Sequence, residues 1–145
     1  MITYRQISTH DREYAQEKEL RNRVLRMPLG LTLSEQDLRG EDRQIHVAAV
    51  DERGAVIGCV LVAFAENSAK IRQIAVEEGH RGRGIGTKLM TGAEQIVRDR
   101  NLGVVTLHAR LTARRFFEKL GYRLVSDVFT EVTIPHVKME KILFG

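Results

Sequence analysis

Short stretches of apolar and β-branched residues recur along the chain and predict a β-sheet interrupted by helices. Two of them, 45–50 and 55–64, are separated by the polar turn 51–54, which is typical of a β-hairpin. Five further stretches of this kind predict strands over 2–7, 70–76, 104–108, 122–128 and 137–143. The pattern therefore predicts a sheet of about six or seven strands.

Capping residues and the helical spacing of apolar residues predict about four helices around these strands. Thr9 or Asp11 caps the first helix, which extends to about Leu25. Ser34, with Asp37 three residues later, is typical of a capping box and begins a short second helix. The other two helices are predicted over about 86–100 and 112–120.

The order of these elements favours a mixed α/β (α+β) fold with a mostly antiparallel sheet. In the second half of the chain a helix twice separates consecutive strands, and such strand–helix–strand crossovers are right-handed. We expect the first crossover to bring strands 70–76 and 104–108 side by side in parallel.

Length and composition limit the class of protein. With 145 residues, the chain is long enough for a single domain, expected over 1–145. No stretch approaches the ~18 continuous apolar residues that a membrane span requires. The N-terminus has no basic segment followed by an apolar core, so we expect no secretory signal and a cytoplasmic protein. The lone Cys59 excludes an intramolecular disulfide and a cysteine-rich metal site.

The positive charge is concentrated in one part of the chain. Residues 71–123 hold 11 Lys and Arg against 5 Asp and Glu, whereas the rest holds 12 against 14. This asymmetry indicates an anionic ligand near the basic part. Nucleic acid would fit the charge, but the chain has no Trp and few aromatic side chains on which bases could stack.

A loop rich in glycine and arginine, residues 81–87, lies directly between a predicted strand and a predicted helix. A helix N-terminus carries unpaired N–H groups and a partial positive charge, and glycines let a phosphate approach the backbone closely. Arg81 and Arg83 add full charges with phosphate-matching geometry. The loop is therefore suited to a pyrophosphate, the alternative being a glycine-rich turn with a solvated basic rim.

Two familiar phosphate loops do not fit the spacing of this segment. A dinucleotide fingerprint needs Gly at its sixth position, but counting from Gly82 gives Thr87 and counting from Gly84 gives Leu89. A Walker loop needs Gly immediately before Lys, and here Thr87 precedes Lys88.

Strand 71–76 and the motif Arg81-x-x-Gly84-x-Gly86 together resemble the acetyl-CoA signature of the GNAT superfamily of N-acyltransferases. Segment 108–122 is similar to the fourth helix of that family and its exit turn. The resemblance follows the whole chain in element order and is specific from about 70 to 141. It implies a GNAT-like fold with splayed parallel central strands. It also implies an enzyme that moves an acetyl group from acetyl-CoA, as cosubstrate, to a primary amine of a small molecule or peptide by direct attack.

The resemblance also implies where acetyl-CoA binds. The pyrophosphate would contact the backbone amides of 82–87, and the pantetheine arm would lie as an extra strand beside 74–76. The Val76 amide would then stabilise negative charge on the thioester oxygen. The implied cofactor-binding residues are Ile74, Ala75, Val76, Arg81, Gly82, Arg83, Gly84, Ile85, Gly86, Thr87 and Phe117.

The residues expected around the acceptor do not identify the substrate. In this fold the acceptor pocket is expected from about 23–40 and 126–137, segments of mixed charge. We expect acetyl-CoA and an unidentified amine as partners, with neither nucleic acid nor membrane. A homodimer is common among similar proteins.

The acceptor amine must lose a proton, so a general base is expected, and Glu66, Glu131 and His136 are the candidates. Glu66 falls in a turn, where a solvated surface role is favoured. Glu131 and His136 frame the last predicted hairpin, and we take these two as the catalytic candidates, since histidine titrates near neutral pH. His108 is expected to donate a structural hydrogen bond and Cys59 to be a buried small hydrophobe.

The sequence departs from the family pattern at two positions. Arg110 stands where many relatives have an Asn that contacts the cofactor arm, and Phe117 stands where many have a Tyr that protonates the leaving thiolate. Tyr122 is expected to point elsewhere. The missing phenol keeps open the alternative of a CoA-binding module without catalysis.

Overall fold

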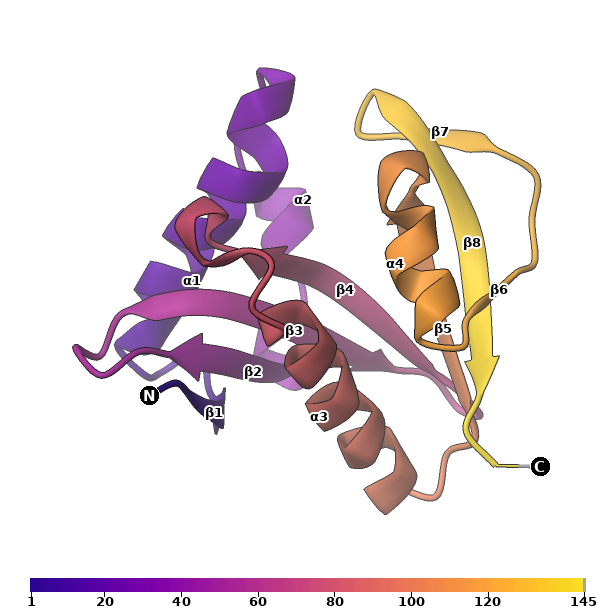
Figure 1. Cartoon of the computed structure of the whole chain (residues 1–145), viewed down its shortest axis with the longest axis horizontal. Helices are drawn as coiled ribbons and strands as arrows, with labels where there is room; N and C mark the ends of the chain where they lie inside the picture. The colour runs from indigo at the N-terminus through magenta and orange to yellow at the C-terminus, as the bar shows by residue number, and fades with distance from the viewer. Residues whose placement is uncertain (145) are drawn as a thin grey trace.

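In the computed structural model, which describes residues 1–144, an eight-stranded sheet forms the middle layer and helices cover both of its faces (Figure 1). The strands are β1 (Thr3–Ile7), β2 (Ile45–Val50), β3 (Val56–Phe64), β4 (Ala69–Val76), β5 (Val104–Arg110), β6 (Arg123–Leu124), β7 (Phe129–Glu131) and β8 (Ile134–Ile142). The α-helices are α1 (Glu13–Arg21), α2 (Glu35–Leu38), α3 (Ile85–Asp99) and α4 (Arg114–Lys119). A π-helical turn, Asn22–Arg26, continues α1.

The alternation of side chains along the strands explains the two apolar layers. On β2, Val47 packs into the cluster that contains α3, whereas its neighbour Ala48 packs on the opposite face against Leu20 of α1. Phe117 of α4 belongs to the same cluster as α3. Helices α3 and α4 therefore cover one face of the sheet, and α1 covers the other. None of the helices within the described residues combines the length and apolar character needed to cross a bilayer.

The strand order is β1-β2-β3-β4-β5-β8-β6, and β7 pairs with β8 outside this path. Among the strands that the structure describes, β4 and β5 are the one parallel pair, as the crossover through α3 predicts, and the other pairs are antiparallel. The predicted GNAT-like mixed fold is confirmed. The helix that separates β4 and β5 leaves their carboxyl ends at one edge of the molecule.

The two parallel strands separate soon after they meet (Figure 1). They pair only from Ala69 to Ile71 on β4, opposite Val105 to Leu107 on β5. Immediately beyond, β4 carries an extra residue against β3, and Gln73 adopts a positive φ of 53°. Such a bulge bends its strand, so it turns β4 away from β5 and opens the space between them.

Most of the predicted elements are present with small shifts of their ends. The first strand, the hairpin of β2 and β3, and the capping box of Ser34 and Asp37 are confirmed. The predicted cap of α1 at Thr9 or Asp11 is wrong, because the helix begins after Arg12, which makes no side-chain cap. Strand β5 continues to Arg110 beyond its predicted end.

The prediction for the last strands needs a larger correction. The predicted strand 122–128 shrinks to the two residues of β6, and β7 was not predicted, so the sheet has eight strands rather than six or seven. Pro135 lies inside β8 rather than between strands. It is tolerated there because β5 ends at Arg110, opposite His136, so no β5 carbonyl faces the missing N–H of Pro135.

Candidate active site

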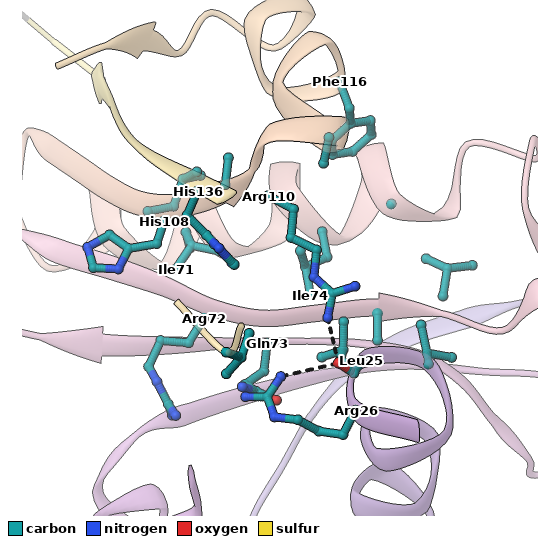
Figure 2. Close-up of a pocket in the computed structure, with 18 of the residues that line it drawn as sticks. Leu25, Arg26, Ile71, Arg72, Gln73, Ile74, His108, Arg110, Phe116 and His136 are labelled. Carbon is teal, nitrogen blue, oxygen red and sulfur yellow. Dashed lines mark hydrogen bonds between the residues drawn. The ribbon is translucent and has the colours of Figure 1, made fainter. Parts of the chain in front are cut away.

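The space between the diverging strands is a cavity of about 1240 Å³. Its wall combines the ends of β4 and β5, the loop that follows β4, the first turns of α3 and α4, the segment between α1 and α2, and the β7–β8 hairpin. Figure 2 shows side chains from these separate elements facing one another across the cavity. Segments far apart in the sequence thus form one site because β4 and β5 splay.

The glycines of the loop leave bare backbone at the mouth of the cavity. Gly82 and Gly84 both adopt positive φ angles, 79° and 78°, and no atom lies within 4 Å of where a Cβ would be. Gly84 is the N-cap of α3, so the unpaired amides of the first helical turn follow it. Gly86 has another role, because a Cβ there would lie 3.2 Å from Phe116 Cζ. Such a cradle of amides, open and positively polarised, fits a diphosphate.

The two loop arginines differ in position. Arg81 lines the cavity, and its Nε donates to the Val76 carbonyl oxygen at 3.3 Å. Arg83 instead contacts His80, with 3.0 Å between Nη1 and Nδ1, and its side chain is not on the cavity wall. The loop and strand residues proposed from the sequence that do line the cavity are Ile74, Ala75, Val76, Arg81, Gly82, Gly84, Gly86 and Thr87. The side chain of Ile85, the first residue of α3, is buried in the core, so only its backbone is available at the loop.

The end of β4 presents backbone groups to the cavity. Glu77 donates its N–H to the Ile57 carbonyl on the β3 side at 2.8 Å. Because amides alternate sides along a strand, the Val76 N–H points the other way, toward the space left by β5. Phe117 lies across this space, buried and on the cavity wall.

The phenol of Tyr122 lies outside the cavity, as its position after the helix cap predicts. Its hydroxyl donates to Glu94 Oε2 at 2.8 Å in the core, where burial, followed by the negative charge of Glu94, raises the pKa of Tyr122. Among the described residues that line the cavity, none is a tyrosine.

Three polar side chains from β5, β7 and β8 meet on the cavity wall. Glu131 Oε1 lies 2.8 Å from His108 Nδ1, and Glu131 Oε2 lies 3.7 Å from His136 Nε2. A carboxylate can only accept, so His108 carries its proton on Nδ1 and, when neutral, keeps the lone pair of Nε2 free. His136 is nearly buried and donates Nδ1–H to the Ile134 carbonyl at 3.0 Å. Among the described residues neither Nε2 has a hydrogen-bond partner, but that of His136 lies beside the Glu131 carboxylate. The Nε2 of His108 is therefore the free nitrogen that suits proton abstraction.

Of the other residues considered from the sequence, Glu66 and Cys59 lie away from the cavity wall, and His108 lies on it. Glu66 is exposed in the turn between β3 and β4, away from the cavity wall. Cys59 is buried, its thiol donates to the Gln73 carbonyl at 3.4 Å, and burial raises the pKa of the thiol. His108 does make a hydrogen bond, but inside the cavity and with Glu131. The period-two alternation of β5, which puts His108 and Arg110 on one face, is the signal that could have identified this site.

Two of the arginines on the acceptor side are fully engaged by the protein. Arg26 forms a forked pair with Asp37, at 3.0 Å and 3.4 Å. Arg72 Nη1 donates to Gln44 at 2.7 Å and lies 3.5 Å from Glu41 Oε2, while its Nη2 donates to a backbone carbonyl. These contacts make the two guanidiniums part of the cavity wall.

Comparison with known proteins assigns a family to this arrangement. A family model described as the acetyltransferase (GNAT) domain matches residues 3–143. YyaT, an uncharacterised protein of Bacillus subtilis, is 36% identical over 85 residues, which span 59% of this chain and 57% of YyaT. The uncharacterised N-acetyltransferase YjcF of the same organism is 29% identical over 102 residues, or 70% of this chain and 72% of YjcF. The chain thus spans little more than half the length of YyaT.

Solved structures share the fold over nearly the whole chain. A protein from Lactobacillus plantarum superposes with a TM-score of 0.87 and 24% identity, covering 99% of each chain. An aminoglycoside 6'-N-acetyltransferase solved in complex with coenzyme A has a TM-score of 0.79 and 20% identity, covering 99% of this chain and 98% of that one.

Proposed function

The chain belongs to the GNAT acetyltransferase family, and on that premise we propose that it is an N-acetyltransferase that moves the acetyl group of acetyl-CoA to a primary amine of a small molecule or peptide. The observation that carries the proposal is the splay of β4 and β5 beside the glycine loop. One end of the resulting cavity offers amides to a diphosphate, and the other offers a histidine–glutamate pair to an amine.

The glycine loop supports the cofactor half of the proposal. Gly82 and Gly84 keep the backbone accessible, the amides at the start of α3 point into the mouth, and Arg81 adds a charge. A structural relative with the same fold was solved with coenzyme A. When bound, acetyl-CoA supplies the activated acetyl group as a thioester. The Val76 N–H is placed to donate to the oxygen that gains charge during attack.

The acceptor half needs a neutral amine, and His108 with Glu131 supports its formation. We infer that His108 Nε2 takes the proton, directly or through a water molecule, while Glu131 holds the ring through Nδ1 and stabilises the imidazolium that forms. This assigns the base to His108, and keeps Glu131 and His136 in the site as its immediate support. His136, behind Glu131, limits how that carboxylate can rotate.

A CoA-binding module without robust catalysis is the second candidate, and the absence of a phenol from the described cavity wall favours it. Thiol release from acetyl-CoA separates the two. We expect the purified protein to release CoA in the presence of at least one member of a panel of polyamines, aminosugars, amino acids and peptide N-termini. Mass spectrometry should then show the acetylated amine. Tight binding of acetyl-CoA with no acetylated product from any amine class would contradict the proposal and favour the module.

A further inference from the structure

The acceptor side of the cavity is lined by basic side chains because of strand alternation. Ile71 and Leu107 pair across β4 and β5 and are buried beneath α3. Their neighbours Lys70 and His108 therefore point to the opposite face of the sheet. Arg110, two residues along β5, lies on that same face.

Arg110 is the guanidinium on this face that the protein leaves uncompensated. Its Nη2 donates to the Leu25 carbonyl at 2.5 Å, which uses one of its five N–H donors. Within residues 1–144 no carboxylate lies within 4.0 Å of Arg110 or of Lys70. Figure 2 shows Arg110 and Arg26 approaching the same Leu25 carbonyl from opposite sides of the cavity. Asp37 neutralises only Arg26.

Two guanidiniums meet at one carbonyl and a carboxylate pairs with only one of them, which leaves a positive charge inside a partly buried cavity. Burial, and then the charge of Arg26, lower the pKa of Arg110. Burial also lowers the pKa of Lys70, against the opposing effect of Glu131. Charged groups in such places are normally paired. Arg110 therefore lacks a counter-anion among the described residues, and a ligand could supply one.

We propose that the amine acceptor carries a carboxylate or phosphate group that Arg110 binds on the acceptor side of the cavity. This inference rests on the acetyl transfer proposed above. Arg110 lies two residues from His108 on β5, and two residues of a strand span about 7 Å. The amine beside His108 and the anion at Arg110 are therefore a few bonds apart, as in a small amino acid or a phosphorylated amino alcohol.

Matched acceptors test the inference, because each anionic amine has a neutral partner. We would compare glycine, β-alanine and γ-aminobutyrate with their amides, and phosphoethanolamine with ethanolamine, by thiol release at saturating acetyl-CoA. The three amino acids and their amides test recognition of a carboxylate, and phosphoethanolamine with ethanolamine tests recognition of a phosphate. The increasing length of the three amino acids tests the distance between the amine and the anion. We expect kcat/KM for at least one anionic member to exceed that of its neutral partner by about tenfold to a hundredfold.

Variants at Arg110 connect that preference to the structure. Arg110→Gln should raise KM for the anionic acceptor by about tenfold to a hundredfold, leave its neutral partner little changed, and leave acetyl-CoA affinity unchanged. Arg110→Lys should restore part of the preference. Arg115 is exposed and outside the cavity, so Arg115→Gln is the matched control and should behave as the native protein. Thermal melting checks that each variant is folded.

A binding measurement keeps this inference separate from the acetyl transfer itself. Glycine and phosphoethanolamine would be titrated calorimetrically into the complex with CoA, which carries no acetyl group. Arg110-dependent binding of either probe supports the anion site even if no amine is acetylated, a result that would overturn the proposed function alone. Equal turnover of neutral and anionic amines, or a loss of acetyl-CoA affinity in Arg110→Gln with acceptor KM unchanged, would overturn the anion site.

Discussion

At the scale of single residues, Glu131 is the side chain on which the acceptor site depends most. Glu131→Gln keeps the shape of the side chain but removes the charge that holds and stabilises the His108 ring. We expect kcat to fall by about 10²-fold or more, with acetyl-CoA affinity unchanged, because a positioned base typically contributes 10²–10⁴-fold. Steady-state kinetics and calorimetry measure the two quantities. Glu66→Gln, in an exposed turn outside the cavity, is the control. Parallel loss of stability and cofactor affinity would indicate a structural role instead.

Phe117 raises the question of how the thiolate leaves. A simple thiol has a pKa near 8.5, so its thiolate is a modest base at neutral pH and can leave without an acid. We therefore expect measurable transfer by the native chain, and equal or faster chemistry in Phe117→Tyr if the ring keeps its buried place on the cavity wall. Single-turnover thiol release compares the two forms. An inert native protein beside an active Phe117→Tyr variant would show that the chain binds CoA without catalysing transfer.

At the scale of elements, the turn that leads into α3 decides cofactor binding. Gly84→Val would place a branched side chain in the open space that the amides face and would strain a φ of 78°. We expect acetyl-CoA binding to be lost in a protein that still folds. Gly54→Val is matched in strain, since Gly54 has a φ of 83° and lies in the hairpin turn away from the cavity. Gly54→Val should lower the free energy of unfolding about as much as Gly84→Val does, but it should bind acetyl-CoA as the native protein does. If calorimetry finds native affinity for Gly84→Val, the pyrophosphate is not on this loop.

The β7–β8 hairpin contains a strained turn next to Glu131. Val132 and Thr133 adopt φ angles of 43° and 70°, a conformation that β-branched residues rarely take and that Asn-Gly adopts readily. Replacing the pair by Val132→Asn and Thr133→Gly should relieve strain of roughly 1–3 kcal/mol per residue and raise the melting temperature by several degrees. Val132 also lines the cavity, so we expect a higher acceptor KM in the same variant. A lower melting temperature would show that the hairpin is not under strain.

At the scale of the whole molecule, a buried polar network under α1 connects the first helix to the cavity. Arg21 donates to Glu17 at 3.2 Å and to Glu41 at 2.8 Å, and its Nε donates to the side chain of Gln73 at 3.1 Å. Glu17, Glu41 and His46 are close enough to hold a cation, but Arg21 already pairs with both carboxylates. The network therefore supports the bulge in β4 that opens the cavity.

This network makes stability depend on pH in both directions. Both His46 nitrogens face acceptors, Glu17 Oε1 at 2.9 Å and the Glu41 carbonyl at 2.8 Å, so the ring is held as a cation. Burial alone would disfavour that charge, but the hydrogen bond and charge of Glu17 raise the pKa of His46 above its ordinary 6.5. Its contribution is complete below pH 6.5 and is lost as pH rises through the raised pKa.

Glu41 behaves in the opposite sense. Burial alone would favour its neutral form, but hydrogen bonds and the charge of Arg21 hold the pKa of Glu41 below its ordinary 4.5. Its contribution is therefore present above pH 4.5 and lost on acidification through the lowered pKa.

Denaturant unfolding as a function of pH tests both signs. We expect the free energy of unfolding of the native protein to fall as the pH drops below 4.5 and as it rises above 6.5. In His46→Gln the decline above pH 6.5 should be reduced, by at most about 1.4 kcal/mol per pH unit, the limit for one proton. The acid decline should remain in that variant. An unchanged alkaline slope would show that His46 is not charged in the folded protein.

The sequence by itself determined the features that depend on neighbouring residues. The glycine loop, the capping box at Ser34 and the two crossovers follow from turn chemistry and from periods of two and 3.6 residues, so local patterns specify them. Only the tertiary structure decided that His108 and Glu131 meet, since they lie 23 residues apart on β5 and β7 and meet through the register of β8. It also decided that Arg83 contacts His80 rather than the cavity and that no carboxylate among residues 1–144 pairs with Arg110. These outcomes depend on the bulge at Gln73 and on where strands end, and the energies that set them come from contacts between distant segments rather than from any local pattern.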